Sequence, residues 1–135
     1  MVRLNPYLSF KSNAREAMEF YKSIFGGKLD ISTFGEMAHD PSEKDNVMHA
    51  MLEGDNGVVF MAADTPEGMT FDPGRNIRMS LSGDDEALLK GYWEGLTEGA
   101  QVEVALDKAP WGDTFGMLTD KYGIGWLVNI TGAHA

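Results

Sequence analysis

The clearest pattern in the sequence is an alternation of apolar and polar positions that occurs twice. In the first half Leu8 and Phe10 alternate with Tyr7 and Ser9. In the second half residues 77–82 alternate in the same way, with apolar Ile77, Met79 and Leu81 between polar Arg78, Ser80 and Ser82. Successive side chains of a strand point to opposite faces of a sheet, so each run predicts a strand with one buried face.

An amphipathic helix is predicted directly after each of these strands. In the first half Asn13 is a candidate N-cap, with Glu16 three residues later, and the glycines at 26–27 end the helix. In the second half Asp84 is the candidate cap and Gly99 the stop. The apolar positions between these signals have helical spacing: Ala17, Phe20, Tyr21, Ile24 and Phe25 in the first half, and Leu88, Leu89, Tyr92, Trp93 and Leu96 in the second.

Three further strand-like runs follow each helix. They cover residues 28–36, 46–53 and 57–64 in the first half, and residues 101–106, 113–119 and 124–130 in the second. The sequence Gly54-Asp55-Asn56-Gly57 predicts a hairpin turn. The segment 65–75 contains Pro66 and Pro73 and is interpreted as the link between the halves.

The two halves also resemble each other residue by residue. An offset of 71 positions pairs Asn5 with Asn76, Ser9 with Ser80, and Tyr21 with Tyr92. A repeat of this length indicates a duplicated supersecondary unit, because a solenoid would need more copies. The predicted organisation is one α+β domain, residues 1–135, of tandem βαβββ modules: module one at 1–64, a linker at 65–75, and module two at 76–131.

Composition narrows the classes of partner. The chain has 135 residues, 11 basic and 21 acidic side chains, a net charge of -10 and no cysteine. A strongly negative surface repels phosphate backbones and anionic lipids, so we expect neither nucleic acid nor a membrane as a partner. Disulfides and thiol chemistry are excluded. The N-terminal residues contain no apolar signal region, and cytoplasmic residence is the expectation.

A set of motifs spread over nearly the whole chain resembles the vicinal-oxygen-chelate superfamily, which includes glyoxalase I, bleomycin-resistance proteins and extradiol dioxygenases, and within it the PhnB-like branch. The matching segments are Tyr7-Leu8-Ser9-Phe10, Asn13-Ala14-Arg15-Glu16-Ala17, Glu19-Phe20-Tyr21, Phe25-Gly26-Gly27, Met48-His49-Ala50, Asp64-Thr65-Pro66, Asn76-Ile77, Trp111-Gly112, Phe115-Gly116-Met117, Asp120, Gly123 and Trp126-Leu127-Val128-Asn129. The resemblance implies a glyoxalase/bleomycin-resistance/dioxygenase-like fold, whose concave mixed sheets enclose a cavity and carry their helices outside. It also implies a homodimer.

Metal-dependent members of this superfamily place one metal ligand on the first and fourth strand of each module. On that pattern the ligand positions hold Asn5 and Asn76 on the first strands, and Phe60 and Leu127 on the fourth, within one residue of register. A shift by one residue offers Met61 and Trp126 instead. Iron, nickel and zinc prefer imidazole, carboxylate or thiolate donors, so we expect no metal and no other cofactor.

The histidines do not supply a metal site. His134 lies in the C-terminal tail, His39 lies in a loop beside Asp40, and only His49 lies on a predicted strand. His49 is interpreted either as a hydrogen-bonded structural residue or as a general base.

Strand alternation predicts which side chains share the concave face of the implied fold. Arg78 is expected to pair with an anionic ligand group or with Asp64, and the internal pair is favoured. Trp111 and Phe115 close over a planar ligand or simply plug the cavity. The candidate ligand-binding residues are Asn5, Tyr7, Ser9, His49, Phe60, Asp64, Asn76, Arg78, Ser80, Trp111, Phe115, Leu127 and Asn129.

Two classes of function remain open. The first is metal-free binding of a small organic molecule, which the mixture of apolar, amide and hydroxyl side chains favours. The second is an enzyme, either a divergent metal-dependent lyase, isomerase or dioxygenase, or a metal-free one that uses His49 or Asp64 as its base. PhnB-like sequences are also labelled ubiquinone-pathway methyltransferases, but nothing in this sequence resembles a methyl-donor site. A dinucleotide-binding fingerprint is not present either, since Gly123-Ile124-Gly125 lacks the third glycine and the helix.

Overall fold

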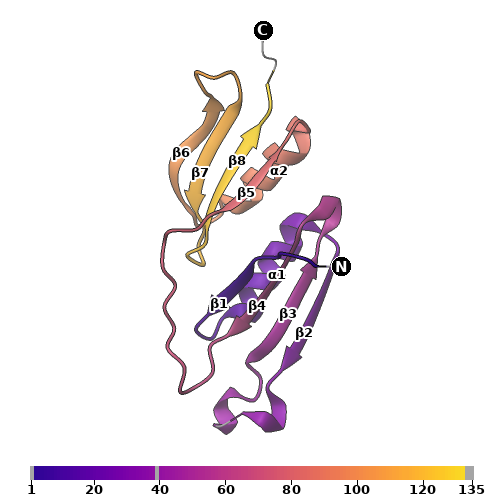
Figure 1. Cartoon of the computed structure of the whole chain (residues 1–135), viewed down its shortest axis with the longest axis vertical. Coiled ribbons are helices and arrows are strands. Elements are labelled where there is room, and N and C mark those ends of the chain that lie inside the picture. The colour runs from indigo at the N-terminus through magenta and orange to yellow at the C-terminus, as the bar shows by residue number, and fades with distance from the viewer. Residues whose placement is uncertain (1, 39, 133–135) are drawn as a thin grey trace. The chain divides into compact units, whose positions relative to one another are not determined.

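The computed structural model describes residues 2–38 and 40–132 of the chain. Contacts divide it into two compact units, Met1–Pro73 and Gly74–Ala135. In the described residues each unit contains one α-helix and a four-stranded mixed sheet, and the α-helix covers one face of its own sheet (Figure 1). The predicted α+β architecture of tandem βαβββ modules is thereby confirmed. No helix of the described residues combines the length and the apolar character needed to cross a membrane.

The first unit has the strand order β1-β4-β3-β2. Strand β1 is parallel to β4, and the other neighbours are antiparallel. The elements are β1 Tyr7–Phe10, α1 Ala14–Phe25, β2 Lys28–Thr33, β3 Val47–Glu53 and β4 Val59–Asp64. Strand β2 is shorter than the predicted run 28–36, because the chain turns into a short 3-10 helix at Gly35–Met37. A second 3-10 helix, Pro41–Glu43, follows before β3.

The second unit repeats this arrangement with the order β5-β8-β7-β6. Its elements are β5 Met79–Gly83, α2 Glu86–Leu96, β6 Gln101–Lys108, β7 Thr114–Thr119 and β8 Gly125–Ile130. The same hydrogen bond ends both sheets: Thr65 N donates to the Phe10 carbonyl and Thr131 N to the Gly83 carbonyl, both at 2.7 Å. The duplication therefore extends to the way each last strand is attached to the first.

Each core lies between a helix and the face of its sheet that the helix covers. The predicted apolar stripe of the first helix is largely buried, since Ala17, Tyr21 and Phe25 are all almost inaccessible. Tyr21 and Phe25 pack edge-on against Phe60, with ring centroids 5.5 and 6.2 Å apart. In the second unit the buried residues of α2 are Leu89, Tyr92, Trp93 and Leu96. Among the described residues, no α-helix of the same unit covers the opposite face of either sheet, and we call it the open face.

The helix caps differ from the prediction. Asn13 occupies the N-cap position of α1, but its side chain makes no cap hydrogen bond. Instead, the first backbone N–H of the helix, that of Ala14, donates a hydrogen bond to the carboxylate of Asp64 at the end of β4. In the second unit the cap is Asp85 rather than Asp84, and its carboxylate accepts a hydrogen bond from Leu88 N. The first N–H groups of a helix have no partner within the helix, and an acceptor for them fixes where the helix starts.

Candidate functional site

The open face of the first sheet carries a tyrosine and a histidine in contact. Tyr7 on β1 is aligned with Met61 on β4, and Met61 with Met51 on β3, so these side chains share one face. His49, two residues before Met51, lies on the same face. The Tyr7 hydroxyl is 3.3 Å from His49 Nδ1, and their rings are 5.9 Å apart. The pair forms a polar group beside the apolar side chains of Met51 and Met61, and Tyr7 is half exposed to solvent.

Phe60 and Asp64 are not part of this face, and their predicted placement is wrong. Phe60 packs beneath α1, and Asp64, only 3% exposed, lies on the same side of β4. The predicted register of β4 was therefore wrong by one residue. Met61 takes the place that Phe60 was expected to fill, as the alternative register allowed.

Asp64 has a structural role in the first unit. Its two carboxylate oxygens accept hydrogen bonds from Ala14 N and Val47 N, both at 2.8 Å. Asp64 therefore joins the end of β4 to the start of α1 and the start of β3. These two hydrogen bonds engage both carboxylate oxygens of Asp64, and of the two candidate bases only His49 lies on the open face.

The open face of the second sheet is crossed by one arginine. Arg78, just before β5, forms two hydrogen bonds with Glu103 on β6, of 3.1 and 2.8 Å. Gly125 on β8 lies beneath the arginine, since a Cβ there would be 3.1 Å from Arg78 Cγ. Glu103 also accepts a hydrogen bond from the Thr119 hydroxyl at 3.0 Å. The absence of a side chain at Gly125 lets the guanidinium cross the sheet.

The expected pair of Arg78 with Asp64 is therefore wrong. Asp64 is engaged by two backbone N–H groups of its own unit, whereas Glu103 is within reach of Arg78 across the second sheet. The hydrogen bonds from Arg78 and Thr119 lower the pKa of Glu103 below its ordinary value of 4.5, and the bond to Glu103 raises the pKa of Arg78.

This pair predicts a pH dependence of stability. A carboxyl whose pKa is lower in the folded state favours folding above the unfolded pKa, and this contribution is lost as the pH falls through the folded pKa. We expect Arg78→Gln to reduce the free energy of unfolding at about pH 7 and to have little effect at about pH 3. Urea titrations of both proteins at the two pH values measure this difference. Equal destabilisation at both values would contradict it, and because the pair is partly exposed we expect the effect to shrink in high salt.

Some of the remaining candidate residues lie on the open face of the second sheet, and others lie outside the strands. Ser80 and Leu127 are aligned on β5 and β8 and lie on the open face. Asn129 is on the same face, but its amide Nδ2 donates to Asp113 at 3.0 Å. Asn76, and in the first unit Asn5, precede the strands rather than lying in them.

The predicted aromatic pair is present in the second unit. The rings of Trp111 and Phe115 meet edge to face, with centroids 5.7 Å apart and planes at 64°. Phe115 lies on β7, whereas Trp111 belongs to the preceding turn and is 54% exposed. Asp113 anchors this turn by accepting hydrogen bonds from Asn129 Nδ2 and Gly132 N. An exposed indole held by a fixed turn is able to stack on a planar group.

The positions that bear metal ligands in the resembled superfamily do not fit a transition metal here. With the register corrected, the first unit offers Asn5 and Met61, and the second Asn76 and Leu127. Amide, thioether and hydrocarbon groups are poor ligands for iron, nickel or zinc. Within residues 2–38 and 40–132, no three His, Asp or Glu side chains gather as a metal-binding group. His39 and His134 lie outside the described residues.

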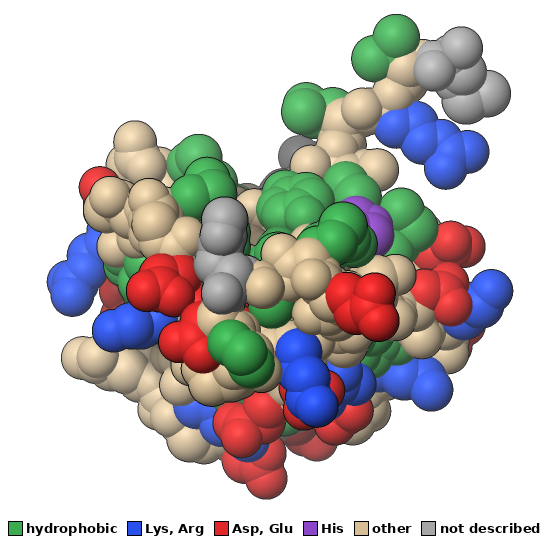
Figure 2. Space-filling view, turned by 90° about the horizontal axis from the view of Figure 1, so that it is seen from below, with side chains coloured by type: hydrophobic (Ala, Val, Ile, Leu, Met, Phe, Trp, Pro, Cys, Tyr) green, Lys and Arg blue, Asp and Glu red, His purple; other side chains and the backbone are tan. Residues whose placement is uncertain are grey.

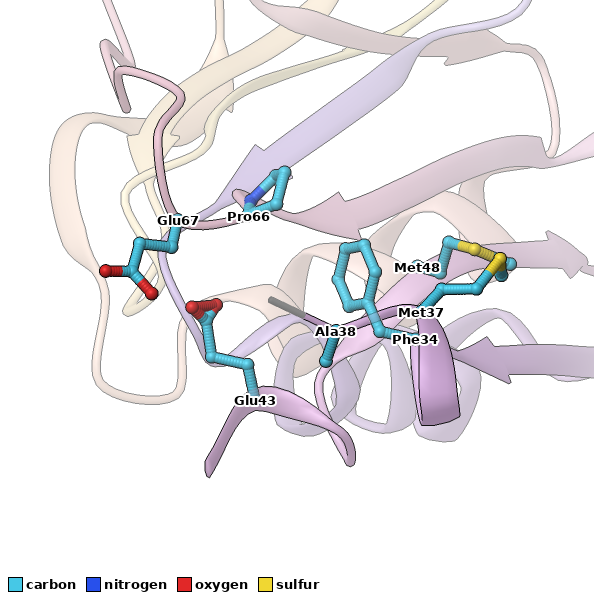
Figure 3. A pocket seen from close by; sticks show the side chains of 7 residues that line it. All are labelled: Phe34, Met37, Ala38, Glu43, Met48, Pro66 and Glu67. Carbon is cyan, nitrogen blue, oxygen red and sulfur yellow. The ribbon is translucent and has the colours of Figure 1, made fainter. Parts of the chain in front are cut away.

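Sequence reasoning missed a pocket of about 290 Å³ in the first unit. It lies where the connection between β2 and β3 approaches the chain after β4 (Figure 3). The lining residues are Phe34, Met37, Ala38, Glu43, Met48, Pro66 and Glu67. They come from three separate segments of the chain, so no local sequence pattern predicts the pocket.

Comparisons with known proteins identify the family and the fold of the chain. The model of the family described as 3-demethylubiquinone-9 3-methyltransferase matches residues 3–129. The crystal structure of protein PA1353 from Pseudomonas aeruginosa is 32% identical, with 96% of this chain and 98% of that chain covered and a TM-score of 0.85. A putative 3-demethylubiquinone-9 3-methyltransferase, PhnB protein, from Bacillus cereus is 27% identical, with 96% and 100% covered and a TM-score of 0.75.

A more distant structure shows the fold alone. The glyoxylase/bleomycin resistance protein/dioxygenase domain from Frankia sp. EAN1pec is 17% identical, with 98% of each chain covered and a TM-score of 0.67. The chain therefore belongs to the PhnB-like family described as 3-demethylubiquinone-9 3-methyltransferase, and it has the fold of the glyoxalase/bleomycin-resistance/dioxygenase proteins.

Proposed function

We propose that this protein binds a small organic molecule on the open faces of its sheets and does so without a transition metal. The observation that carries the proposal is the Tyr7–His49 contact of 3.3 Å beside Met61. Binding sites for small molecules combine an apolar surface with a few fixed polar groups, and this face has that composition. The exposed Trp111 and its partner Phe115 supply an aromatic surface in the second unit.

A library screen without metal tests the proposal. The thermal unfolding midpoint is measured against metabolites and antibiotics in buffer containing a chelator, and molecules that co-purify with the native protein are identified by mass spectrometry. We expect ligands that raise the midpoint in the absence of metal, because a ligand that binds the folded state stabilises it. If every ligand requires an added divalent ion, or if none binds, the proposal is wrong.

The first ligand found then tests the role of Tyr7. We expect Tyr7→Phe to weaken binding by about three- to tenfold, because one hydrogen bond to a polar ligand group is lost. Titration calorimetry gives the dissociation constants. Tyr122→Phe is the matched control, since it removes the same hydroxyl from the turn before β8, and we expect it to leave the affinity unchanged. An equal loss in both variants would contradict the assignment.

One observation favours a second candidate, a metal-free enzyme. His49 Nδ1 lies against a phenolic hydroxyl on an accessible face, which is an arrangement suited to proton transfer. In that case a ligand of the open face would be converted, and His49→Gln would abolish turnover while binding persisted. Incubating the ligand with the protein and analysing the products separates the two functions.

Methyl transfer is not proposed. Gly123 lies in the turn before β8, where its N–H donates to the Asp120 carbonyl, and Gly125 begins that strand, so this glycine sequence opens no helix. A nucleotide-binding glycine loop leads from a strand into a helix N-terminus.

The expected homodimer and the expected cytoplasmic location are part of the proposal of small-molecule binding. Sedimentation of the purified protein and fractionation of cells measure them.

A further inference from the structure

The pocket of the first unit combines an apolar wall with two carboxylates. Phe34, Met37, Met48 and Pro66 form the wall, and Figure 3 shows the aromatic ring and both thioethers together. Met37 is 68% exposed, which is unusual for so apolar a side chain. Aromatic rings and methionine sulfurs are polarisable surfaces that attract cations and adapt to ligands of different shape.

The charged side chains of the lining are both acidic. Glu43 and Glu67 approach the pocket from different segments, and Figure 3 shows their carboxylates at the same end, away from the two methionines. In the part of the chain that the structure describes, neither carboxylate takes part in an ion pair. The pocket lining contains no lysine or arginine.

The segment that carries most of the pocket is fixed by its own hydrogen bonds. Phe34 N donates to the Asn46 carbonyl at 3.1 Å, and Gly35 N to the Lys44 carbonyl at 2.9 Å. Asp40 caps the 3-10 helix that ends at Glu43 by accepting from Ser42 N at 3.0 Å. This hydrogen bond lowers the pKa of Asp40, so a further negative charge is retained close to Glu43 in acidic solution. These hydrogen bonds therefore hold Phe34 and the 3-10 helix that ends at Glu43 in place before a ligand arrives.

We propose that this pocket is a second binding site, separate from the open faces, for an organic cation that consists of an ammonium group and a short apolar substituent. The ammonium group lies between Glu43 and Glu67, and the substituent lies against Phe34, Met37 and Met48. A volume of about 290 Å³ is at the lower end of the range for ligand pockets, so the ligand is smaller than a typical drug. Two carboxylates repel an anion of the same shape.

Three probes of equal chain length test the charge preference: hexyltrimethylammonium, hexanol and hexanoate. We expect the cation to bind with a dissociation constant on the order of 1 mM, and hexanol and hexanoate to bind at least about tenfold more weakly. Protein labelled with ¹³C at the methionine methyl groups locates the site by NMR. The signals of Met37 and Met48 should shift, whereas those of the buried Met18 of α1 and of Met117 in the second unit should not.

Variants test the two carboxylates. The double variant Glu43→Gln, Glu67→Gln should weaken binding of the cation by about tenfold, and each single variant by less. The control Glu53→Gln, which removes one negative charge at the far end of β3, should change it less than twofold. Far-UV circular dichroism verifies that each variant is folded. Equal binding of hexanoate, unchanged affinity of the double variant, or shifts confined to other methionines would overturn the proposal. Tyr7→Phe should leave binding of the cation to the pocket intact. A failure of the pocket proposal is therefore distinguishable from a failure of the open-face proposal.

Discussion

Replacing Asp64 by alanine is expected to lower the free energy of unfolding of the first unit by about 3 kcal/mol. The substitution removes the acceptor of two hydrogen bonds, from Ala14 N and Val47 N. Ala14 and Val47 are fully buried, so water cannot replace the lost partner. The negative charge at the start of α1, which the helix dipole favours, is lost as well.

Chemical unfolding followed by far-UV circular dichroism measures this effect. All three tryptophans of the chain, Trp93, Trp111 and Trp126, belong to the second unit, so tryptophan fluorescence follows that unit separately. The matched control is Asp30→Ala, because Asp30 is exposed and its contact with Lys28 at 3.6 Å contributes little. A variant Asp64→Ala that unfolds at the same denaturant concentration as Asp30→Ala would contradict the role assigned to Asp64.

Asp120→Ala is expected to destabilise the second unit by a similar amount, about 3 kcal/mol. Asp120 is 4% exposed, and its carboxylate accepts hydrogen bonds from Trp126 Nε1 at 2.8 Å and from the backbone N–H groups of Tyr122 and Ile124. The alanine variant leaves the buried indole N–H without its acceptor. It also removes the bonds that hold the turn between β7 and β8.

Tryptophan fluorescence is the direct measurement for Asp120→Ala, since Trp126 lies at the site. Glu94→Ala, at an exposed position of α2, is the control and should change the free energy of unfolding by less than about 0.5 kcal/mol. Asp120→Asn keeps the shape of the side chain and should fall between the two. If Asp120→Ala unfolds with the wild-type midpoint, the turn does not depend on this carboxylate.

Most of the fold could be predicted from local patterns. The alternation of Leu8 and Phe10 with Tyr7 and Ser9 identified β1 and its buried face, and Phe10 is 2% exposed. The glycines after Phe25 marked the end of α1. Gly27 has a positive φ of 81°, and a Cβ there would be 2.0 Å from the Glu53 carbonyl oxygen, so no other residue fits the turn.

The face of β4 could not be predicted in the same way. Its first five residues, Val59 to Ala63, are all apolar, and alternation is informative only where one face is polar. The face was assigned from the ligand positions of the resembled superfamily, which placed Phe60, and by alternation Asp64, on the concave side. Asp64 lies on the buried side because two backbone N–H groups from distant segments need an acceptor there. Packing of α1 against Phe60, a contact between residues far apart in sequence, decides the register.

The candidate site was predictable to the extent that its residues lie on alternating strands. Tyr7, Ser9, His49, Ser80 and Leu127 lie on open faces as expected. The partner of Arg78 was not predictable, because Glu103 is three strands away in the sheet and its approach depends on the missing side chain of Gly125. The pocket around Phe34 depends on two 3-10 helices that were expected to continue β2 or to form a loop.

The parallel pairing of the first and last strands has a consequence for synthesis on the ribosome. Strand β1 has no neighbour until β4 has been made at Val59–Asp64, and β5 waits in the same way for Gly125–Ile130. Pairing over so many residues requires the closure of a long loop, which slows formation of the sheet. While translation proceeds, the apolar side of each helix therefore has only part of its sheet to cover it. These two intervals are when the nascent chain is most open to chaperones and to aggregation.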